Sequence, residues 1–189
     1  MASVLKVDSI EPSTASKVTL NSSGQILEIV SSVCDGSTVN GYTFENVTEA
    51  QEFTTTFTDV TGSSISYTPP SQATQVAYEF NYQAGFTDNH SINSLKFFID
   101  SDEILYARST YTASTNLSAR LNFKWIINIG GTASTNTGRV ATWTSAKTLK
   151  IQGREYGSSN EGKIHHHNYW EGSGTGGFSM PTLTITAIR

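Results

Sequence analysis

A period-two alternation of apolar and polar residues is the dominant signal in the longest apolar segments of this chain, and it favours β-structure for them. Residues 75–83 (QVAYEFNYQ) alternate in this way, and so do residues 120–130 (RLNFKWIINIG). Because successive side chains of a strand point to opposite faces, a period of two places the apolar set on one face and the polar set on the other. Both segments are therefore predicted to be strands that are buried on one side.

Three more segments carry the same signal. Residues 94–108 (SLKFFIDSDEILYAR) predict a hairpin, with a polar turn around residues 100–102 and a return strand through Ile104 and Tyr106. Residues 148–156 (TLKIQGREY) and 181–189 (PTLTITAIR) each predict one strand. The inward side chains expected on these last two strands are Leu149, Ile151, Leu183, Ile185 and Ala187.

The fold class follows from these strands and from the turn-rich segments between them. No window has a helical period, and about eight to ten short strands favour an all-β antiparallel sandwich of the jelly-roll type. A chain of 189 residues fits one such domain, which we place at residues 24–189. Residues 1–23 contain two apolar pulses too short to fold alone, and we expect them to be an attachment segment. The residues expected to make this attachment are Leu5, Val7, Ile10, Val18 and Leu20.

Composition excludes several classes of partner and site. Charged residues make up 15% of the chain and the net charge is -4, so we expect no nucleic-acid partner. Cys34 is the only cysteine, which rules out an intrachain disulfide and a four-cysteine metal site. The N-terminus lacks the apolar core of a signal peptide, and no apolar run is long enough to span a bilayer. We expect synthesis in a cytoplasm and no membrane insertion.

We expect no catalytic residues and no cofactor. The acidic residues lie mostly in turns and form no evident pair of the kind that glycoside hydrolysis needs. The sequence also contains no nucleophile elbow, phosphate-binding glycine loop or zinc-binding His-Glu-x-x-His motif. The chain is therefore expected not to be an enzyme.

Aromatic residues in predicted loops are the candidates for binding a sugar or protein receptor, because they offer rigid contact area at small entropic cost. The alternative for each of them is packing in the core or in a subunit interface. The candidates are Tyr111, Trp143, Tyr156, Tyr169 and Trp170.

Five segments together resemble the fibre-type structural proteins of marine tailed bacteriophages, the cyanophages especially. They are residues 1–20 (MASVLKVDSIEPSTASKVTL), 53–71 (FTTTFTDVTGSSISYTPPS), 94–108, 148–157 (TLKIQGREYG) and 181–189. The resemblance implies a C-terminal jelly roll like that of tumour-necrosis-factor-like trimeric heads, a virion location after assembly in the host cytoplasm, and attachment to portal, tail, collar or capsid. It also implies contact with a host surface glycan or protein.

Two departures from that family refine the expectation. Residues 31–52 form a longer insert than the family has, and no long repetitive shaft is present. These departures favour a short fibre, an appendage or a capsid-decorating protein over a long tail fibre. Phe98 and Ile126 independently favour a homotrimer. Both are apolar residues on the polar face of their strands, so another surface is expected to pack on them, and a subunit interface is the simplest one. Loops folding over these faces within one chain are the alternative.

Three functional hypotheses remain at this point. The first is a non-enzymatic trimeric fibre or appendage that attaches through residues 1–23. The second is a lectin-like adsorption protein that uses its distal loops to bind a receptor. The third is a decoration protein that stabilises a capsid.

Three consecutive histidines, at residues 165–167, are the remaining motif. In an extended strand over residues 163–170 (KIHHHNYW), Ile164 points inward, while His165 and His167 share the opposite face. The resemblance suggests an axial metal, because some trimeric phage fibres hold one with such a pair from each chain. Imidazole suits iron, nickel or zinc. The alternative is a hydrogen-bonded or solvent-exposed strand without metal.

Overall fold

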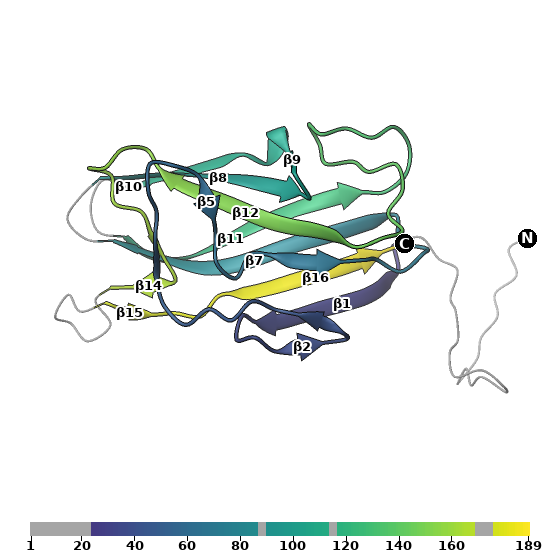
Figure 1. The fold of residues 1–189 in the computed structure, drawn as a ribbon, viewed down its shortest axis with the longest axis horizontal. Coiled ribbons are helices and arrows are strands. Elements are labelled where there is room, and N and C mark those ends of the chain that lie inside the picture. Colours follow the sequence, from purple (N-terminus) through teal and green to yellow (C-terminus); the bar gives the residue numbers. More distant parts are fainter. Residues whose placement is uncertain (1–23, 87–89, 114–116, 169–175) are drawn as a thin grey trace, which may run out of the picture.

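The computed structural model describes residues 24–86, 90–113, 117–168 and 176–189. Within these ranges the chain folds into two layers of antiparallel strands, with no α-helix and one short 3-10 helix, η1 (Leu105–Ala107) (Figure 1). The described residues include no helix long and apolar enough to cross a membrane. The expectation of an all-β sandwich is confirmed.

The first sheet has the long strand β7 at its centre. β11 pairs with one edge of β7 along its whole length, while β16 and β13 pair with successive parts of the other edge. β1 extends the sheet beyond β16, and β4 extends it beyond β13. The strands of this sheet are β1 (Ile26–Val33), β4 (Gln51–Glu52), β7 (Gln75–Phe86), β11 (Leu117–Asn128), β13 (Lys163–Ile164) and β16 (Thr182–Ile188).

The second sheet is built around β8 and β12, which pair with each other. β9 and β10 pair with the two ends of β8, and β6 and β5 pair with the two ends of β12. The strands are β5 (Thr58–Asp59), β6 (Ile65–Tyr67), β8 (Ser91–Ile99), β9 (Asp102–Glu103), β10 (Ser109–Ala113) and β12 (Lys147–Glu155). Two small hairpins lie outside both sheets: β2 (Thr38–Val39) with β3 (Tyr42–Thr43), and β14 (His166–His167) with β15 (Gly177–Phe178).

The strand order identifies the fold as a jelly roll. In the first sheet the spatial order of the main strands is β1, β16, β7, β11, and in the second it is β5 and β6, β12, β8, then β9 and β10. If β5 with β6 and β9 with β10 are each counted as one strand, the sandwich has eight main strands along the chain. The first sheet then contains strands one, eight, three and six in spatial order, and the second sheet contains strands two, seven, four and five. Two interlocked Greek keys produce this order.

The core lies between the two sheets and is formed by the alternating side chains that the sequence pointed inward. Tyr78 from β7 and Phe97 from β8 have ring centroids 4.8 Å apart, and Phe97 lies 5.6 Å from Phe123 of β11, so aromatic rings join the layers. Leu149, Ile151, Leu183, Ile185 and Ala187 are all fully buried, as predicted.

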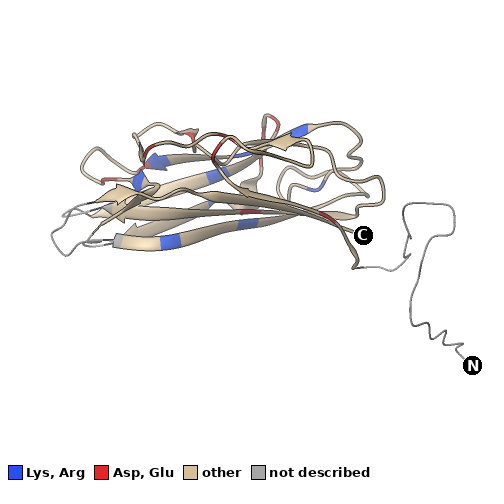
Figure 2. Ribbon diagram, turned by 90° about the horizontal axis from the view of Figure 1, so that it is seen from below, with Lys and Arg blue, Asp and Glu red and all other residues tan. Residues whose placement is uncertain are grey.

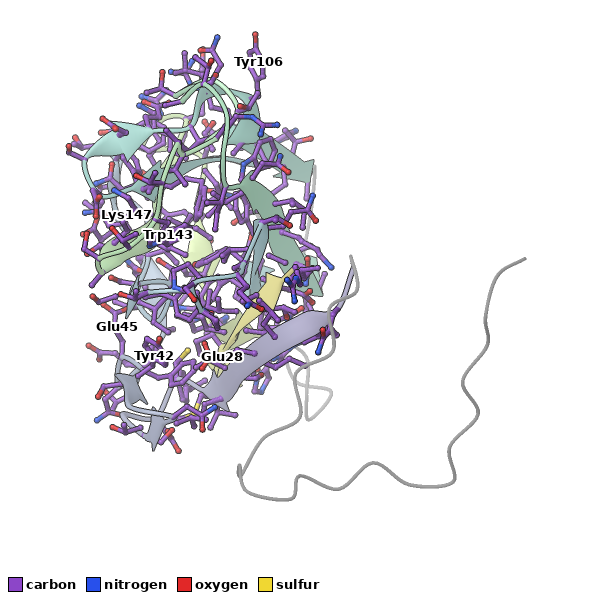
Figure 3. All side chains as sticks on the ribbon, turned by 90° about the vertical axis from the view of Figure 1, so that its right-hand side faces the viewer. Glu28, Tyr42, Glu45, Tyr106, Trp143 and Lys147 are labelled. Atoms are coloured by element: carbon purple, nitrogen blue, oxygen red, sulfur yellow. The ribbon has the colours of Figure 1, made fainter. Side chains whose placement is uncertain are left out.

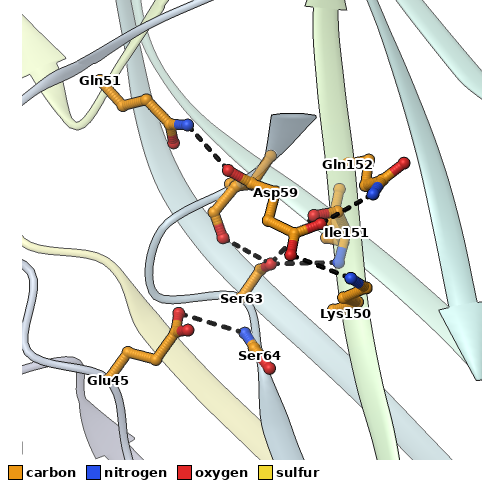
Figure 4. A network of polar contacts seen from close by, with 9 residues as sticks. Glu45, Gln51, Asp59, Ser63, Ser64, Lys150, Ile151 and Gln152 are labelled. Atoms are coloured by element: carbon orange, nitrogen blue, oxygen red, sulfur yellow. Dashed lines mark hydrogen bonds and ion pairs between the residues drawn. The ribbon is translucent and has the colours of Figure 1, made fainter. Parts of the chain in front are cut away.

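One strand position of the second sheet is interrupted, and a serine side chain bridges the gap (Figure 4). β5 and β6 pair with different parts of β12, and Ile151 lies between those parts. The amide of Ile151 donates to Oγ of buried Ser63 at 3.1 Å, and this hydroxyl donates to the carbonyl of Val60 at 2.6 Å. The Ser63 hydroxyl therefore takes the place of a ladder hydrogen bond.

One predicted element is wrong. The hairpin turn after β8 forms as expected, with Asp100 in the left-handed region at φ 56°, but the return strand β9 ends at Glu103. The chain then makes the 3-10 turn η1, in which Tyr106 donates a backbone hydrogen bond to Asn136. The return strand does not continue through Tyr106 because this backbone pairs with a distant loop instead of with β8.

The sandwich has two poles. Gly24 and Arg189, the ends of the described chain, are hydrogen-bonded to each other at the pole we call terminal. β7 and β12 end at the opposite pole, which we call distal, and β8 begins there (Figure 1). Figure 3 looks onto the terminal pole, where β12 begins at Lys147 opposite Tyr67 and where Trp143 is hydrogen-bonded to Tyr67. The predicted attachment residues Leu5, Val7, Ile10, Val18 and Leu20 lie outside the described residues.

Candidate functional site

The distal pole brings together most of the candidate residues that the structure describes. Tyr156 follows directly after β12, and its amide donates to the carbonyl of Ile92 near the start of β8. Its side chain is 66% exposed. Such a ring can contact a partner without losing core packing, so Tyr156 keeps its place as a binding candidate. Tyr169 and Trp170 lie outside the described residues.

Tyr111 lies at the same pole but points inward. It sits on β10 directly opposite Asn93 of β8, whose side chain is buried, and it packs against the core. Burial raises the pKa of its phenol, with a further contribution from Tyr82. The expectation that Tyr111 occupies an exposed loop is therefore wrong: the residue belongs to a strand and faces the opposite sheet.

Trp143 is also misplaced by the sequence prediction. Its side chain is only 5% exposed, and its indole N–H donates to the carbonyl of Tyr67 at 3.2 Å. The rings of Trp143 and Tyr67 meet edge to face, with centroids 6.1 Å apart. Tyr67 pairs with Lys147 at the start of β12, so Trp143 lies at the terminal pole (Figure 3), whereas Tyr156 follows the other end of that strand. Trp143 is a core residue of a long loop, not an exposed binding residue.

The three histidines lie at the distal pole without forming one strand. β13 ends at Ile164, which is fully buried as predicted, and β14 begins at His166. Between them His165 takes the left-handed conformation, at φ 57°. A single left-handed residue reverses the alternation of faces, so His165 points into the protein and is fully buried. The prediction that His165 faces away from the core is wrong.

The imidazole of His165 makes defined contacts inside the fold. Its Nε2 lies 2.9 Å from the carbonyl oxygen of Thr61, and because a carbonyl only accepts, Nε2 carries the proton. The ring meets Phe80 edge to face at 6.1 Å between centroids. Burial lowers the pKa of His165 to about 4, although the bond to Thr61 opposes this shift. His165 is therefore neutral at physiological pH.

These contacts bear on the proposed metal pair. His165 uses Nε2 within the fold, whereas His167 lies two residues on in β14, beyond the left-handed turn. The backbone of His166 packs closely against Gly85 of β7. Only glycine fits there, because a Cβ at residue 85 would come within 2.4 Å of the backbone oxygen of His166. Among the described residues no group of three or more His, Cys, Asp or Glu is placed to hold a metal. The pair thus lacks the shared open face that the metal hypothesis assumed.

A buried polar layer lies under this pole and was not predicted. Ser91 and Asn93 of β8 are fully buried on the inner face, and the amide of Asn93 donates to the Ser91 hydroxyl. The Oδ1 of Asn93 and the hydroxyl of Tyr111 have no hydrogen-bond partner among the described residues. The signal was available, because the alternation of Leu95, Phe97 and Ile99 continues back to these residues.

The terminal pole carries two shallow cavities, which the sequence also did not indicate. One, of about 260 Å³, has an apolar floor that includes Ile104 and Val140, and it is bordered by Arg139 and Lys147. The other, of about 310 Å³, lies between the two prolines at residues 69–70 and Trp143. Both cavities include residues 141–142 in their walls, so they flank one segment of the same loop.

Comparisons with known proteins give loose similarities. No protein-family model matches the sequence, and no curated protein matches it. The structure is similar to that of the infectious bursal disease virus Gx strain, with 9% identity and a TM-score of 0.43, over 96% of this chain and 36% of that one. For the Gt strain the identity is 10% and the TM-score 0.38, over 96% of this chain and 42% of that one.

The third similar structure is described as "CBM4 structure and function", with 9% identity, a TM-score of 0.28, and coverage of 84% of this chain and 78% of that one. This chain spans well under two thirds of the length of the two viral chains. At these identities and TM-scores the similarities assign neither a family nor a function to the chain.

Proposed function

We propose that this protein is a non-enzymatic virion structural protein, a trimeric short fibre or appendage of a bacteriophage particle. It attaches through residues 1–23 and presents the distal pole of the jelly roll outward. The observation that carries the proposal is the separation of the two poles. Gly24 and Arg189 are joined at one pole, so a segment preceding Gly24 leaves from there, while exposed Tyr156 occupies the other. Sequence resemblance to marine phage fibre proteins supports the same reading.

A structural rather than catalytic use of the carboxylates supports the non-enzymatic part. Lys163 of β13 reaches Glu52 of β4 at 2.8 Å, and this hydrogen bond lowers the pKa of Glu52. Arg108 and Lys96 both contact Glu103, and the Arg108 hydrogen bond is the main reason that the pKa of Glu103 is lowered. These two acids are held ionised, whereas a general acid needs a raised pKa. Burial raises the pKa of Glu45 and of Glu155. The Glu45 carboxylate, however, accepts hydrogen bonds from the backbone amides of Gly62 and Ser64, which is a structural use.

The charge distribution supports a protein or glycan partner over a nucleic acid. Lys and Arg are scattered among Asp and Glu over both layers of the described structure, and neither sign is gathered on one strand or at one end (Figure 2). A phosphate backbone is bound by a continuous basic surface, which raises affinity through counterion release. The partners we propose are other copies of this chain, the portal, tail, collar or capsid of the particle, and a host surface molecule.

A lectin-like adsorption protein is the second candidate, and exposed Tyr156 favours it. A tyrosine ring can stack on a sugar or insert into a protein surface, while its hydroxyl hydrogen-bonds the partner. This role is compatible with the first, because an appendage can also adsorb. It differs in placing the essential function at the distal pole instead of in the attachment.

Copurification with the particle tests the proposal. Particles produced by the virus that encodes this chain are purified through a density gradient, and their proteins are quantified by mass spectrometry. We expect the chain to band with infectious particles in a copy number divisible by three. For the released protein, we expect sedimentation at three times the chain mass of 20.5 kDa. Absence of the chain from purified particles contradicts the proposal.

A further inference from the structure

The outer face of the first sheet, which points away from the core, carries an apolar strip at the terminal pole. In the pairing registers, Ile29 of β1, Thr186 of β16, Ala77 of β7 and Ile126 of β11 form one row across all four strands. Ile29 is 51% exposed and Ile126 is 38% exposed. The next row toward the pole consists of Ile26, Ile188, Gln75 and Asn128, so it is apolar on β1 and β16 and polar on β7 and β11. We call the first row together with Ile26 and Ile188 the outer strip.

The outer strip ends at a strand edge that carries no outward-pointing charge. β1 pairs only with β16 among the described strands, so its other edge has no strand partner in a ladder, and the β2–β3 hairpin lies beside it (Figure 1). Its outward side chains, at residues 26, 29, 31 and 33, are three apolar residues and a serine. β11 forms the opposite edge, and there Arg120 and Lys124 point outward. Exposed strand edges usually carry such charges to prevent unwanted association. The contrast indicates that the strip at β1 is normally covered.

We propose that residues 17–23 of the same chain cover the outer strip, with Val18 and Leu20 packed across it. For Ile126 this replaces the subunit interface expected from the sequence by its alternative, a cover from within one chain. This inference rests on the proposed function, in which residues 1–23 form the attachment segment. That segment is then divided into two parts. Residues 17–23 pack against the sheet and fix the direction of the segment, and Leu5, Val7 and Ile10 bind the particle. The segment thereby becomes a rigid joint instead of a free tether.

The position of Gly24 makes this geometry possible. Its amide donates to the carbonyl of Arg189 at 2.6 Å, so the chain enters at the corner of the sheet beside Ile26 and Ile188. Six extended residues from Gly24 back to Val18 span ~20 Å, and four strands are ~14 Å across between the first and last axes. Leu20 and Val18 can therefore reach from this corner to Ile126.

The chemistry of the two surfaces also agrees. The outer strip contains no charged residue, and the first charges on this face are the Glu79–Lys124 pair in the next row. Residues 17–23 (KVTLNSS) alternate apolar and polar side chains, so one face of an extended segment presents Val18 and Leu20 together. A second copy of the chain is the competing occupant, and cross-linking distinguishes the two.

The test is disulfide trapping in the full-length protein. In a Cys34→Ala background, Leu20→Cys is combined with Ile126→Cys, and the protein is oxidised mildly and run on a non-reducing gel. We expect an intrachain disulfide, seen as a faster-migrating monomer. Leu20→Cys with Tyr156→Cys is the matched control, because Tyr156 lies at the far pole, and this pair is expected not to cross-link. Cross-linked dimers place a second copy on the strip and overturn the proposal, and so does the absence of cross-linking.

Hydrogen exchange in full-length variants provides an independent measurement. The double change Val18→Asp with Leu20→Asp is expected to speed exchange of the β1 amides by roughly tenfold or more. Burying one apolar side chain of this size contributes more free energy than a tenfold change in an equilibrium constant represents. Leu5→Asp with Val7→Asp is the control and is expected to leave β1 unchanged. Unchanged β1 exchange in the first variant overturns the proposal. Both tests use isolated protein, so their failure leaves the virion role to be decided by copurification.

Discussion

The Nε2–H of His165 donates to the backbone oxygen of Thr61 at 2.9 Å, from a backbone position with φ 57°. The pKa of this imidazole is lowered from its ordinary 6.5 to about 4, because burial penalises the charged form. The unfolded chain therefore binds a proton more readily than the folded one. The contribution of neutral His165 to the free energy of unfolding is therefore fully present above pH 6.5. It is lost as the pH falls through about 4, and the loss is up to about 3 kcal/mol.

Chemical denaturation between pH 7 and pH 4 measures this loss. His165→Asn is the matched variant, because asparagine tolerates the left-handed conformation and does not titrate. We expect the variant to be less stable at pH 7 and to lose less free energy of unfolding than the wild type on acidification. Parallel pH profiles for the two proteins contradict the assignment of this acid sensitivity to His165.

The Ser63 hydroxyl bridges the gap between β5 and β6, so Ser63→Ala leaves the buried amide of Ile151 without this partner. We expect a loss of about 1–3 kcal/mol in the free energy of unfolding. Ser64→Ala is the control, since Glu45 uses the backbone amide of Ser64 and not its hydroxyl. Equal stability of the two variants in urea denaturation is inconsistent with the bridge.

Tyr156 and Tyr106 are both 66% exposed, but Tyr156 follows the distal end of β12, whereas Tyr106 lies in η1, between the ends of β9 and β10 that pair with β8. This pair separates binding at the distal pole from a general effect of surface tyrosines. We expect both alanine variants to keep wild-type stability to within about 0.5 kcal/mol. In a binding assay on host cells, Tyr156→Ala is expected to weaken adsorption, while Tyr106→Ala leaves it intact. The opposite pattern excludes Tyr156 from receptor binding.

Cys34 is fully buried, and its thiol donates to the carbonyl of Gly62 at 3.3 Å. Burial raises its pKa to about 12, and the nearby carboxylates of Glu45 and Asp35 add to this shift. Because the thiolate is the reactive form, we expect no labelling of the native protein by a thiol reagent at pH 8 and complete labelling after denaturation. Rapid labelling of native protein contradicts the buried position.

The sequence predicted the parts of the fold that depend on strand periodicity. β7, β11, β8, β12 and β16 were all identified because one face of each is buried over many residues, so alternation is imposed by the core. The spatial order of these strands is set by contacts between distant segments. It was reached only as a fold class, from strand number and turn frequency.

The candidate site was predicted less well, for two physical reasons. Alternation fails at His165 because one left-handed residue exchanges the faces, and no local pattern marks that residue. Trp143 lies in a loop, and its side chain is buried by contact with Tyr67, which is distant in the sequence. The residues next to Trp143 in the sequence therefore do not reveal that it is buried. Asn93 was detectable, because it continues the inner face of β8.

The orientation of the jelly roll on the particle tests the central claim most directly. A cryo-microscopy map of the intact virion, fitted with this fold, separates the terminal pole at Gly24 and Arg189 from the distal pole at Tyr156. The account predicts threefold density with the terminal pole toward the particle and Tyr156 pointing outward. Density with the Tyr156 pole against the particle, or particles that contain no copy of this fold, contradicts it.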